Sequence, residues 1–331
     1  MNTRSWPWQF FGGLLLIPAF DACAAQAAST LPSYPSKSIR IVVGMAPGGG
    51  TDIATRLFAQ KLSESVGQTV LVENRAGAGG IVGAEIAAKA TQDGHTLMMT
   101  STTQTVLPSM YKSLPYDIVK DFAPISVVVV SPIVFTAHPS VPVASLRELI
   151  SLAKAKPGEV TYGSAGNGSI FHLAMELFGS MAGARLMHVP FNGGGPSTNA
   201  ALGGQIQLLS GSMPTALPNV RAGKLRGLGV TSAQRSQLAP DLPTVAESSG
   251  LSGYEAALWY GLIAPAATPM TVIRKLNAEV ASLLKQRDVK EKLTTLGFEL
   301  QHNSPEEFAQ LIRSDIVKWG KVVRDSGAKI D

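Results

Sequence analysis

Several residue types are scarce in this sequence, and each shortage excludes a class of protein. The 331 residues include one cysteine, Cys23, so disulfide bonds do not hold the chain together. Charged residues make up 15% of the chain and aromatic residues 6%, and the net charge is only +5. Because that small excess is spread without runs of one sign, we expect no nucleic-acid partner. A polytopic membrane protein is also excluded, since no apolar stretch reaches about 18 residues.

The chain has instead a high apolar content and many turn residues. Hydrophobic residues make up 45% of it, with 33 glycines and 21 prolines. This apolar content excludes a disordered chain. The length suits roughly two domains of ~150 residues each. The composition therefore predicts an α/β protein with more than one core.

The N-terminal residues form a separate unit in the sequence. Arg4 precedes the apolar run Phe10–Phe20, and Ala22–Ala24 has the small-x-small pattern of a cleavage site. Residues 1–24 are therefore predicted to be a signal peptide that is cleaved on export, although cleavage one or three residues later would serve equally well. Two alternatives are a membrane anchor, for which the run is short, and a lipoprotein acylated at Cys23, whose preceding residues are a poor lipidation sequence.

From Ile39 onward, short β-branched runs alternate with helical patterns. The predicted strands begin with Ile39–Met45, Thr69–Glu73 and Thr96–Thr100, and continue with separate strands at 125–130 and 133–137. The later part is predicted to become helical, with helices over 269–286 and 304–326. This alternation predicts mostly parallel sheets with helices on both faces.

A glycine-rich turn follows a strand and opens a helix four times. These turns lie at 47–50, 77–80, 166–168 and 193–195. Glycine permits a sharp turn, and the free N–H groups at a helix start can bind a carboxylate or a phosphate. In open α/β sheets such turns lie at the carboxyl ends of strands, where ligands bind. Any strand-to-helix connection also needs a tight turn, so the pattern allows either a ligand site or a purely structural role.

Signatures of catalysis and of metal binding are missing from the sequence. It contains no Gly-x-Ser-x-Gly elbow and no phosphate-binding loop ending in Gly-Lys-Ser/Thr. The five histidines are scattered, and although His172 and Glu176 share a helix face, no third metal ligand has a suitable spacing. Ser164 and Ser169 have no recognisable base nearby. We therefore predict no enzyme, no metal site and no cofactor.

Ten ordered motifs carry a resemblance to a known family. They are Tyr34–Val43, Pro47–Asp52, Val72–Gly80, Asp93–Leu97, Leu114–Asp117, Lys120–Ile125, Tyr162–Gly168, His188–Phe191, Leu242–Glu247 and Trp319–Val323. Together they resemble the Bug family, the periplasmic substrate-binding proteins of tripartite tricarboxylate transporters. The resemblance covers essentially the whole mature chain. It implies a type II periplasmic-binding-protein fold of two α/β lobes, each a mostly parallel sheet flanked by helices, with the ligand in the interlobe cleft.

The resemblance also implies an organisation and a role. Lobe 1 would comprise 31–132 and 254–331, and lobe 2 would comprise 133–253. The ligand would be a small di- or tricarboxylate or a related acid, delivered by a monomeric periplasmic receptor to the membrane permease subunits of the transporter. The alternative is a sensory co-receptor that presents the same ligand to a membrane histidine kinase.

The family's binding loops are carried onto this chain residue by residue. The predicted ligand-binding residues are Met45, Gly48, Gly49, Gly50, Thr51, Asp52, Thr102, Thr103, Gly166, Asn167, Gly168, Ser169, Asn192 and Gly193. Asp52 suits either a helix cap or a ligand contact. Met45 replaces an aromatic residue common in relatives, and Ser210-Gly211-Ser212 replaces a common Asp-Asn pair, which favours a plain carboxylate over an amino acid.

Overall fold

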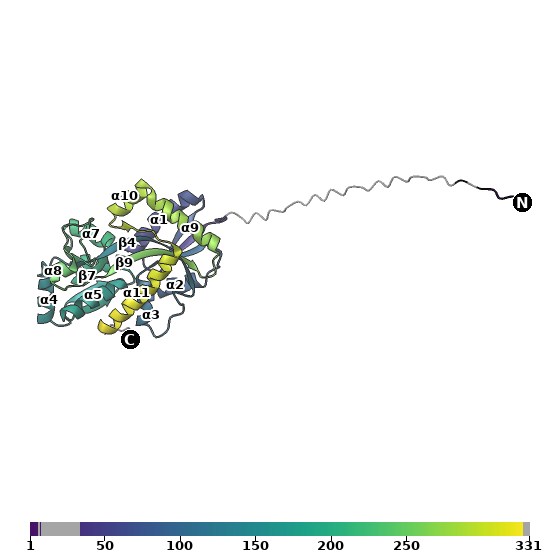
Figure 1. Cartoon of the computed structure of the whole chain (residues 1–331). Helices are drawn as coiled ribbons and strands as arrows, with labels where there is room; N and C mark the ends of the chain where they lie inside the picture. Colours follow the sequence, from purple (N-terminus) through teal and green to yellow (C-terminus); the bar gives the residue numbers. More distant parts are fainter. Residues whose placement is uncertain (6, 8–33, 327–331) are drawn as a thin grey trace. The chain divides into compact units, whose positions relative to one another are not determined.

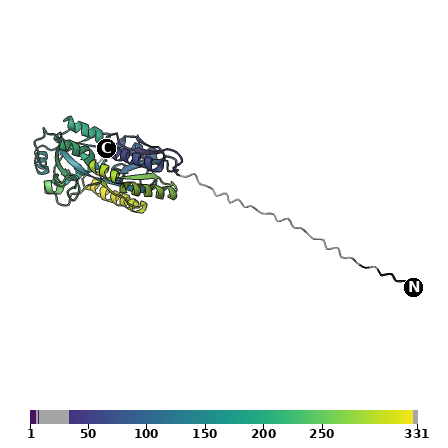
Figure 2. The same cartoon turned by 90° about the horizontal axis from the view of Figure 1, so that it is seen from above.

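The structure is a computed structural model that describes residues 1–5, 7 and 34–326. The predicted core of the signal peptide and Cys23 lie outside the described residues. From Tyr34 onward, the chain forms one continuous ten-stranded sheet flanked by helices (Figures 1 and 2). In the described part of the chain, no helix is both long enough and apolar enough to cross a membrane.

The sheet has two sections that share one long strand. The first section contains β1 (Ile39–Val43), β2 (Val70–Asn74), β3 (Thr96–Ser101), β4 (Phe122–Ala137), β9 (Ala257–Pro265) and the short β10 (Glu299–Leu300). The order β2-β1-β3-β9-β4 places β1 between two parallel neighbours, while β9 runs antiparallel to β3 and β4. Because β1 is buried inside the sheet, its sequence is almost continuously apolar.

The second section continues from the far half of β4. Its other strands are β5 (Thr161–Ser164), β6 (Met187–Pro190), β7 (Leu208–Ser212) and β8 (Arg226–Val230). Both β7 and β8 pair antiparallel with β4, and β5 lies parallel between β7 and β6. The carboxyl ends of β5 and β6 therefore point the same way, and the turns that follow them are neighbours.

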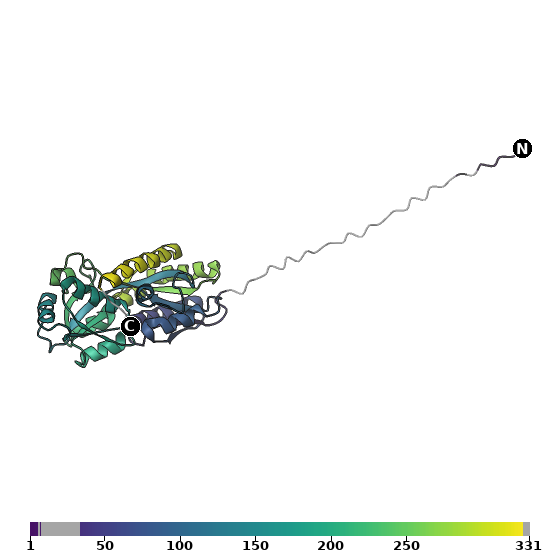
Figure 3. The same ribbon diagram turned by 90° about the horizontal axis from the view of Figure 1, so that it is seen from below.

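Helices group around the section to which their strands belong. They are α1 (Gly50–Val66), α2 (Ile81–Ala88), preceded by the 3-10 turn η1 (Ala78–Gly80), α3 (Thr103–Met110), α4 (Leu146–Ala155), α5 (Ile170–Ala182), α6 (Gly194–Leu202), α7 (Met213–Arg221), α8 (Val245–Ser249), α9 (Met270–Lys285), α10 (Arg287–Thr295) and α11 (Pro305–Ser326). In Figure 1, α4, α5, α7 and α8 gather on one side of β4 and β9, and α1, α2 and α9 on the other; Figure 3 shows the same grouping from below. Helix α11 contacts both α3 and α5.

The prediction of two separate strands at 125–130 and 133–137 is wrong, because β4 runs through both. Residues Phe122–Pro132 pair with β9, and residues from Ile133 onward pair with β7. Pro132 has no N–H to donate, and it lies where β4 passes from one set of neighbours to the next, so it interrupts neither ladder. A single strand thus connects the two sections.

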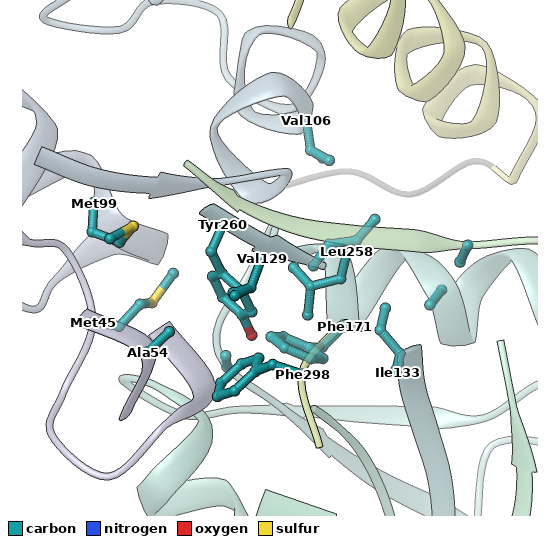
Figure 4. Packing of buried hydrophobic residues seen from close by; sticks show 14 of the residues in the cluster. Met45, Ala54, Met99, Val106, Val129, Ile133, Phe171, Leu258, Tyr260 and Phe298 are labelled. Carbon is teal, nitrogen blue, oxygen red and sulfur yellow. The ribbon is translucent and has the colours of Figure 1, made fainter. Parts of the chain in front are cut away.

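Large apolar side chains pack against the paired strands β4 and β9 and form the main core. Figure 4 shows Met45 between Met99 and Ala54, and Tyr260 beside Phe298. The rings of Tyr260 and Phe298 meet edge-on, with their centroids 5.9 Å apart. Met45 is thus part of the main core, at the edge that faces the glycine turns.

Candidate ligand-binding site

The glycine turn between β1 and α1 lies against the turn between β6 and α6. The Ala46 N–H donates to the Asn192 carbonyl oxygen at 3.0 Å. A Cβ atom added to Gly195 would lie only 2.5 Å from the Pro47 carbonyl oxygen, so the two backbones approach more closely than a side chain would allow. The contact brings together four predicted site residues, Gly48, Gly49, Asn192 and Gly193.

The other two glycine turns also meet. A Cβ on Gly79, in the turn before α2, would lie 2.7 Å from the Asn167 carbonyl oxygen, in the turn between β5 and α5. Next to this contact, the Thr103 hydroxyl accepts a hydrogen bond of 3.3 Å from the Ile170 N–H. The predicted residues of segment 166–169 therefore adjoin Thr103 and the turn at 77–80.

Four helix N-termini converge where these turns meet. Gly50 begins α1 and packs against Ser212, the N-cap of α7, while the turn of Gly166 before α5 lies against Phe191, just before α6. The first N–H groups of a helix lack partners within it, and the helix dipole makes this end positive. The region consequently favours an anion.

Asp52 braces the first turn from inside. Its carboxylate accepts hydrogen bonds from the Gly48 N–H (3.0 Å), the Asn74 side chain (2.9 Å) and Arg56 (3.0 Å). Burial alone would raise the pKa of Asp52, but these hydrogen bonds together hold it below its ordinary value. Both carboxylate oxygens are occupied by these contacts in the present arrangement.

The two predicted threonines after β3 bond to the protein backbone. Thr102 Oγ1 accepts the Trp259 N–H at 3.0 Å, which ties the start of α3 to β9. Thr103 reaches the start of α5, as described above. Both threonines are buried. Their hydrogen bonds tie α3 to β9 and to the start of α5.

Two buried hydroxyls at the start of α1 are absent from the predicted set of ligand-binding residues. Tyr260 of β9 is 1% exposed and Ser212 is 2% exposed, and a Cβ on Gly50 would lie 2.5 Å and 2.6 Å from their oxygens. Among the described residues, no group completes a well-formed hydrogen bond with Tyr260 Oη. Burial raises the pKa of Tyr260, and the nearby hydroxyls of Ser212 and Thr51 offset part of that rise. The Ser-Gly-Ser sequence before α7 marked Ser212, but nothing marked a tyrosine inside a strand.

Two of the five histidines are not scattered, contrary to the sequence prediction. His172 of α5 and His188 of β6 stack with their ring centroids 4.0 Å apart and an interplanar angle of 10°. His188 Nε2 lies 2.7 Å from Ser164 Oγ, so Ser164 does have an imidazole beside it. Ser164 is fully buried and also bonds within its own turn, where it shapes the backbone. Within the described residues, no three His, Cys, Asp or Glu side chains gather as a metal-binding group.

A cavity of about 450 Å³ opens beside the contact between the first and fourth turns. Its lining includes Gly48, Gly195, Pro214 and Thr215, which come from both sections of the sheet. A larger cavity of about 660 Å³ lies beside the paired segments Val130–Pro132 of β4 and Ala257–Leu258 of β9, and none of the glycine turns lines it. Of these two cavities, the smaller lies at the starts of α1, α6 and α7, and Gly48 is the predicted ligand-binding residue in its lining.

Comparisons with known proteins identify the family of the chain. Residues 54–328 match the family described as the tripartite tricarboxylate transporter family receptor. The chain is 36% identical to the protein BugT of Bordetella pertussis over 320 residues, which cover 96% of this chain and 98% of BugT. The solved structure of R. palustris Rpa4515 with adipate is 34% identical and has a TM-score of 0.87; the match covers 90% of this chain and 100% of that one. MatC from Rhodopseudomonas palustris with bound malate is 32% identical and has a TM-score of 0.84; the match covers 88% of this chain and 100% of that one.

An α/β body with converging helix N-termini is suited to binding an anionic solute. The chain belongs to the tripartite tricarboxylate transporter family receptors, and it is a receptor and not an enzyme. The predicted Bug-family membership and the predicted type II periplasmic-binding-protein fold are confirmed.

Proposed function

We propose that this receptor binds a small carboxylate with two or more acid groups where α1, α5, α6 and α7 begin. The observation that carries this proposal is the convergence of four helix N-termini, with buried hydroxyls between them. Backbone N–H and hydroxyl groups donate hydrogen bonds, and carboxylate oxygens accept them. The similar R. palustris proteins, solved with adipate and with malate, support a dicarboxylate.

The ligand-binding residues fall into three groups by their position. The first turn contributes Met45, Gly48, Gly49, Gly50 and Thr51, braced by Asp52; the segment after β3 contributes Thr102 and Thr103; and the opposite turns contribute Gly166, Asn167, Gly168, Ser169, Asn192 and Gly193. Asp52 acts chiefly by keeping the first turn in shape, since its oxygens are occupied by Arg56, Asn74 and Gly48. Tyr260 and Ser212 join this set as hydroxyl donors.

Two lobes close over the ligand in this proposal. Residues 31–132 with 254–331 form lobe 1, residues 133–253 form lobe 2, and β4 and β9 form the hinge. The close contacts between opposing turns, such as that of Pro47 with Gly195, then belong to the closed arrangement. The ligand stabilises this arrangement because it bonds both lobes at once.

Export and delivery complete the proposal. Residues 1–24 direct the chain to the periplasm and are removed, and the mature receptor carries its ligand as a monomer to the membrane permease subunits. The family's role in tripartite transport supports this assignment.

A thermal-shift screen of the mature protein tests the function. The panel holds dicarboxylic, tricarboxylic and aromatic acids together with amino acids, and calorimetry follows on each acid that raises the melting temperature. We expect dicarboxylates to give the largest shifts. A response to amino acids alone would contradict the proposed ligand class. So would no response from protein that has been unfolded, dialysed and refolded to remove bound ligand.

A further inference from the structure

The stacked histidines lie directly behind the turn at 166–169 that the proposed function assigns to the ligand. The Gly168 N–H donates to His172 Nδ1 at 3.2 Å. Ser164 Oγ, which lies 2.7 Å from His188 Nε2, accepts the Gly166 N–H at 3.1 Å. The Ser169 hydroxyl reaches the same oxygen at 3.4 Å. The pair therefore holds three of the four positions in this turn, directly or through Ser164.

The bond from Gly168 requires an uncharged His172 ring. His172 Nδ1 accepts a hydrogen bond only when it carries no proton, which places the ring proton on Nε2. A protonated His172 would turn a donor toward the Gly168 N–H and break that bond. Two cations stacked 4.0 Å apart would also repel each other strongly. Burial accordingly lowers the pKa of His172 to about 4, and burial with the neighbouring His172 lowers that of His188 to about 3.

The groups around the pair connect it to the surface away from the ligand site. His172 Nε2 lies 3.9 Å from Glu176, and Tyr162, which stacks on His188, donates a hydrogen bond of 2.5 Å to the same carboxyl group. Burial raises the pKa of Glu176. Glu176 and Arg185 line a surface cavity of about 350 Å³. A proton from solvent can therefore reach Glu176 and His172 without entering the ligand cleft.

We propose that His172 and His188 are positioning residues that, as neutral rings, hold the turn at 166–169 in its ligand-binding geometry, so that acid loosens the turn and weakens ligand binding. The inference rests on the proposed function, because the turn matters to binding only if the ligand lies there. Ligand and proton then oppose each other, and this coupling is reciprocal: the bound ligand makes both rings harder to protonate.

The test is a histidine side-chain nitrogen NMR titration of the mature protein, without and with saturating adipate. The stacked pair is identified by the contact between its two rings, so the assignment needs no variant. We expect His172 to carry its proton on Nε2 at neutral pH, and its protonation midpoint to fall when adipate is added. If adipate binds and both midpoints stay where they were, the inference is overturned while the proposed function stands. If neither adipate nor malate binds at pH 7.5, the proposed function fails and the inference with it.

A variant series adds a binding readout. His172→Asn keeps an acceptor that does not titrate, so adipate affinity should survive at pH 7.5. Between pH 7.5 and 4, where His172 is about half protonated, wild-type affinity should fall about twofold more than that of this variant. The comparison cancels the protonation of adipate itself. His138→Asn is the matched control, since that ring bonds Ser140, and it should follow the wild type. Identical pH profiles for His172→Asn and the wild type would refute the positioning role.

Discussion

At the scale of single residues, missing Cβ atoms decide how closely the glycine turns approach. A Cβ added to Gly195 would lie 2.5 Å from the Pro47 carbonyl oxygen, which is too close. A Cβ added to Gly203, at the end of α6, would have as its nearest neighbour the Asn199 carbonyl oxygen at 3.5 Å, which is an ordinary contact. Gly195 does not adopt a left-handed backbone conformation, so an alanine there conflicts only with the opposite turn. Substitutions at these two positions therefore separate an effect on the proposed lobe closure from an effect on folding.

Gly195→Ala should weaken ligand binding more than it weakens the fold. The added methyl meets Pro47 only when the turns are in contact, so Kd should rise about tenfold, which is about 1.4 kcal/mol. The melting temperature without ligand should change little. Calorimetry on this variant beside Gly203→Ala checks the prediction, and equal affinities for the two would disprove it.

Tyr260→Phe and Tyr254→Phe should have opposite signatures. The Tyr260 hydroxyl is buried without a well-formed hydrogen bond, so its removal should leave stability unchanged or higher while raising Kd. The Tyr254 hydroxyl donates to the Ala174 carbonyl at 2.7 Å, so its loss should cost about 1 kcal/mol of stability and spare binding. Urea unfolding and calorimetry on both variants would reveal the contrast, and unchanged affinity of Tyr260→Phe would remove its hydroxyl from the site.

At the scale of elements, α11 links the two groups of helices. It begins with a reciprocal cap in which the Ser304 hydroxyl accepts the Glu307 N–H at 3.1 Å and the Glu307 carboxylate accepts the Ser304 N–H at 2.8 Å. Further along the helix, Asp315 accepts the indole N–H of Trp259 on β9 at 2.7 Å. The helix therefore stabilises the crossing strand as well as its own neighbours.

Ser304→Ala should lower the free energy of unfolding by about 1 kcal/mol, because it removes the N-cap of α11. Ser314→Ala is the matched control, since that exposed hydroxyl bonds only the carbonyl of Leu311 in its own helix. Urea titrations of both variants test this. A loss for Ser314→Ala as large as that for Ser304→Ala would mean that the cap contributes nothing particular.

Sequence patterns revealed elements where one signal dominated and missed those where two signals conflicted. Strand β1 and helix α11 were predictable from apolar runs and caps, whereas α7 has a proline at its second position and another inside, so its helical pattern was hidden. The glycine turns were predictable because glycine has a specific backbone use. The histidine pair was not, because His188 reaches His172 only through the parallel pairing of β5 with β6, which places Tyr162 opposite His188.

At the scale of the whole molecule, the histidines make stability depend on pH. Both have a pKa in the folded protein below the ordinary value of about 6.5, so their contribution is fully present above that pH and is lost as the pH falls toward 4. For His172 alone, stability should drop by about 2 kcal/mol between pH 8 and 5. Urea unfolding of the wild type and of His172→Asn at both pH values measures this share; equal drops would contradict it.

The chain enters the second section through β4 and returns to the first through β9, and this path sets an order of assembly. Strand β9 lies between β3 and β4, yet it is made after every element of the second section. The segment between β4 and β9 is continuous, so its strands and helices can pair as soon as they have left the ribosome or the export channel. The first section cannot complete its sheet until β9, which ends at Pro265, has been made and can pair between β3 and β4. A chain cut short before Ala257 would therefore leave the edges of β3 and β4 exposed to neighbouring chains, which makes late truncations more prone to aggregate than to fold in part.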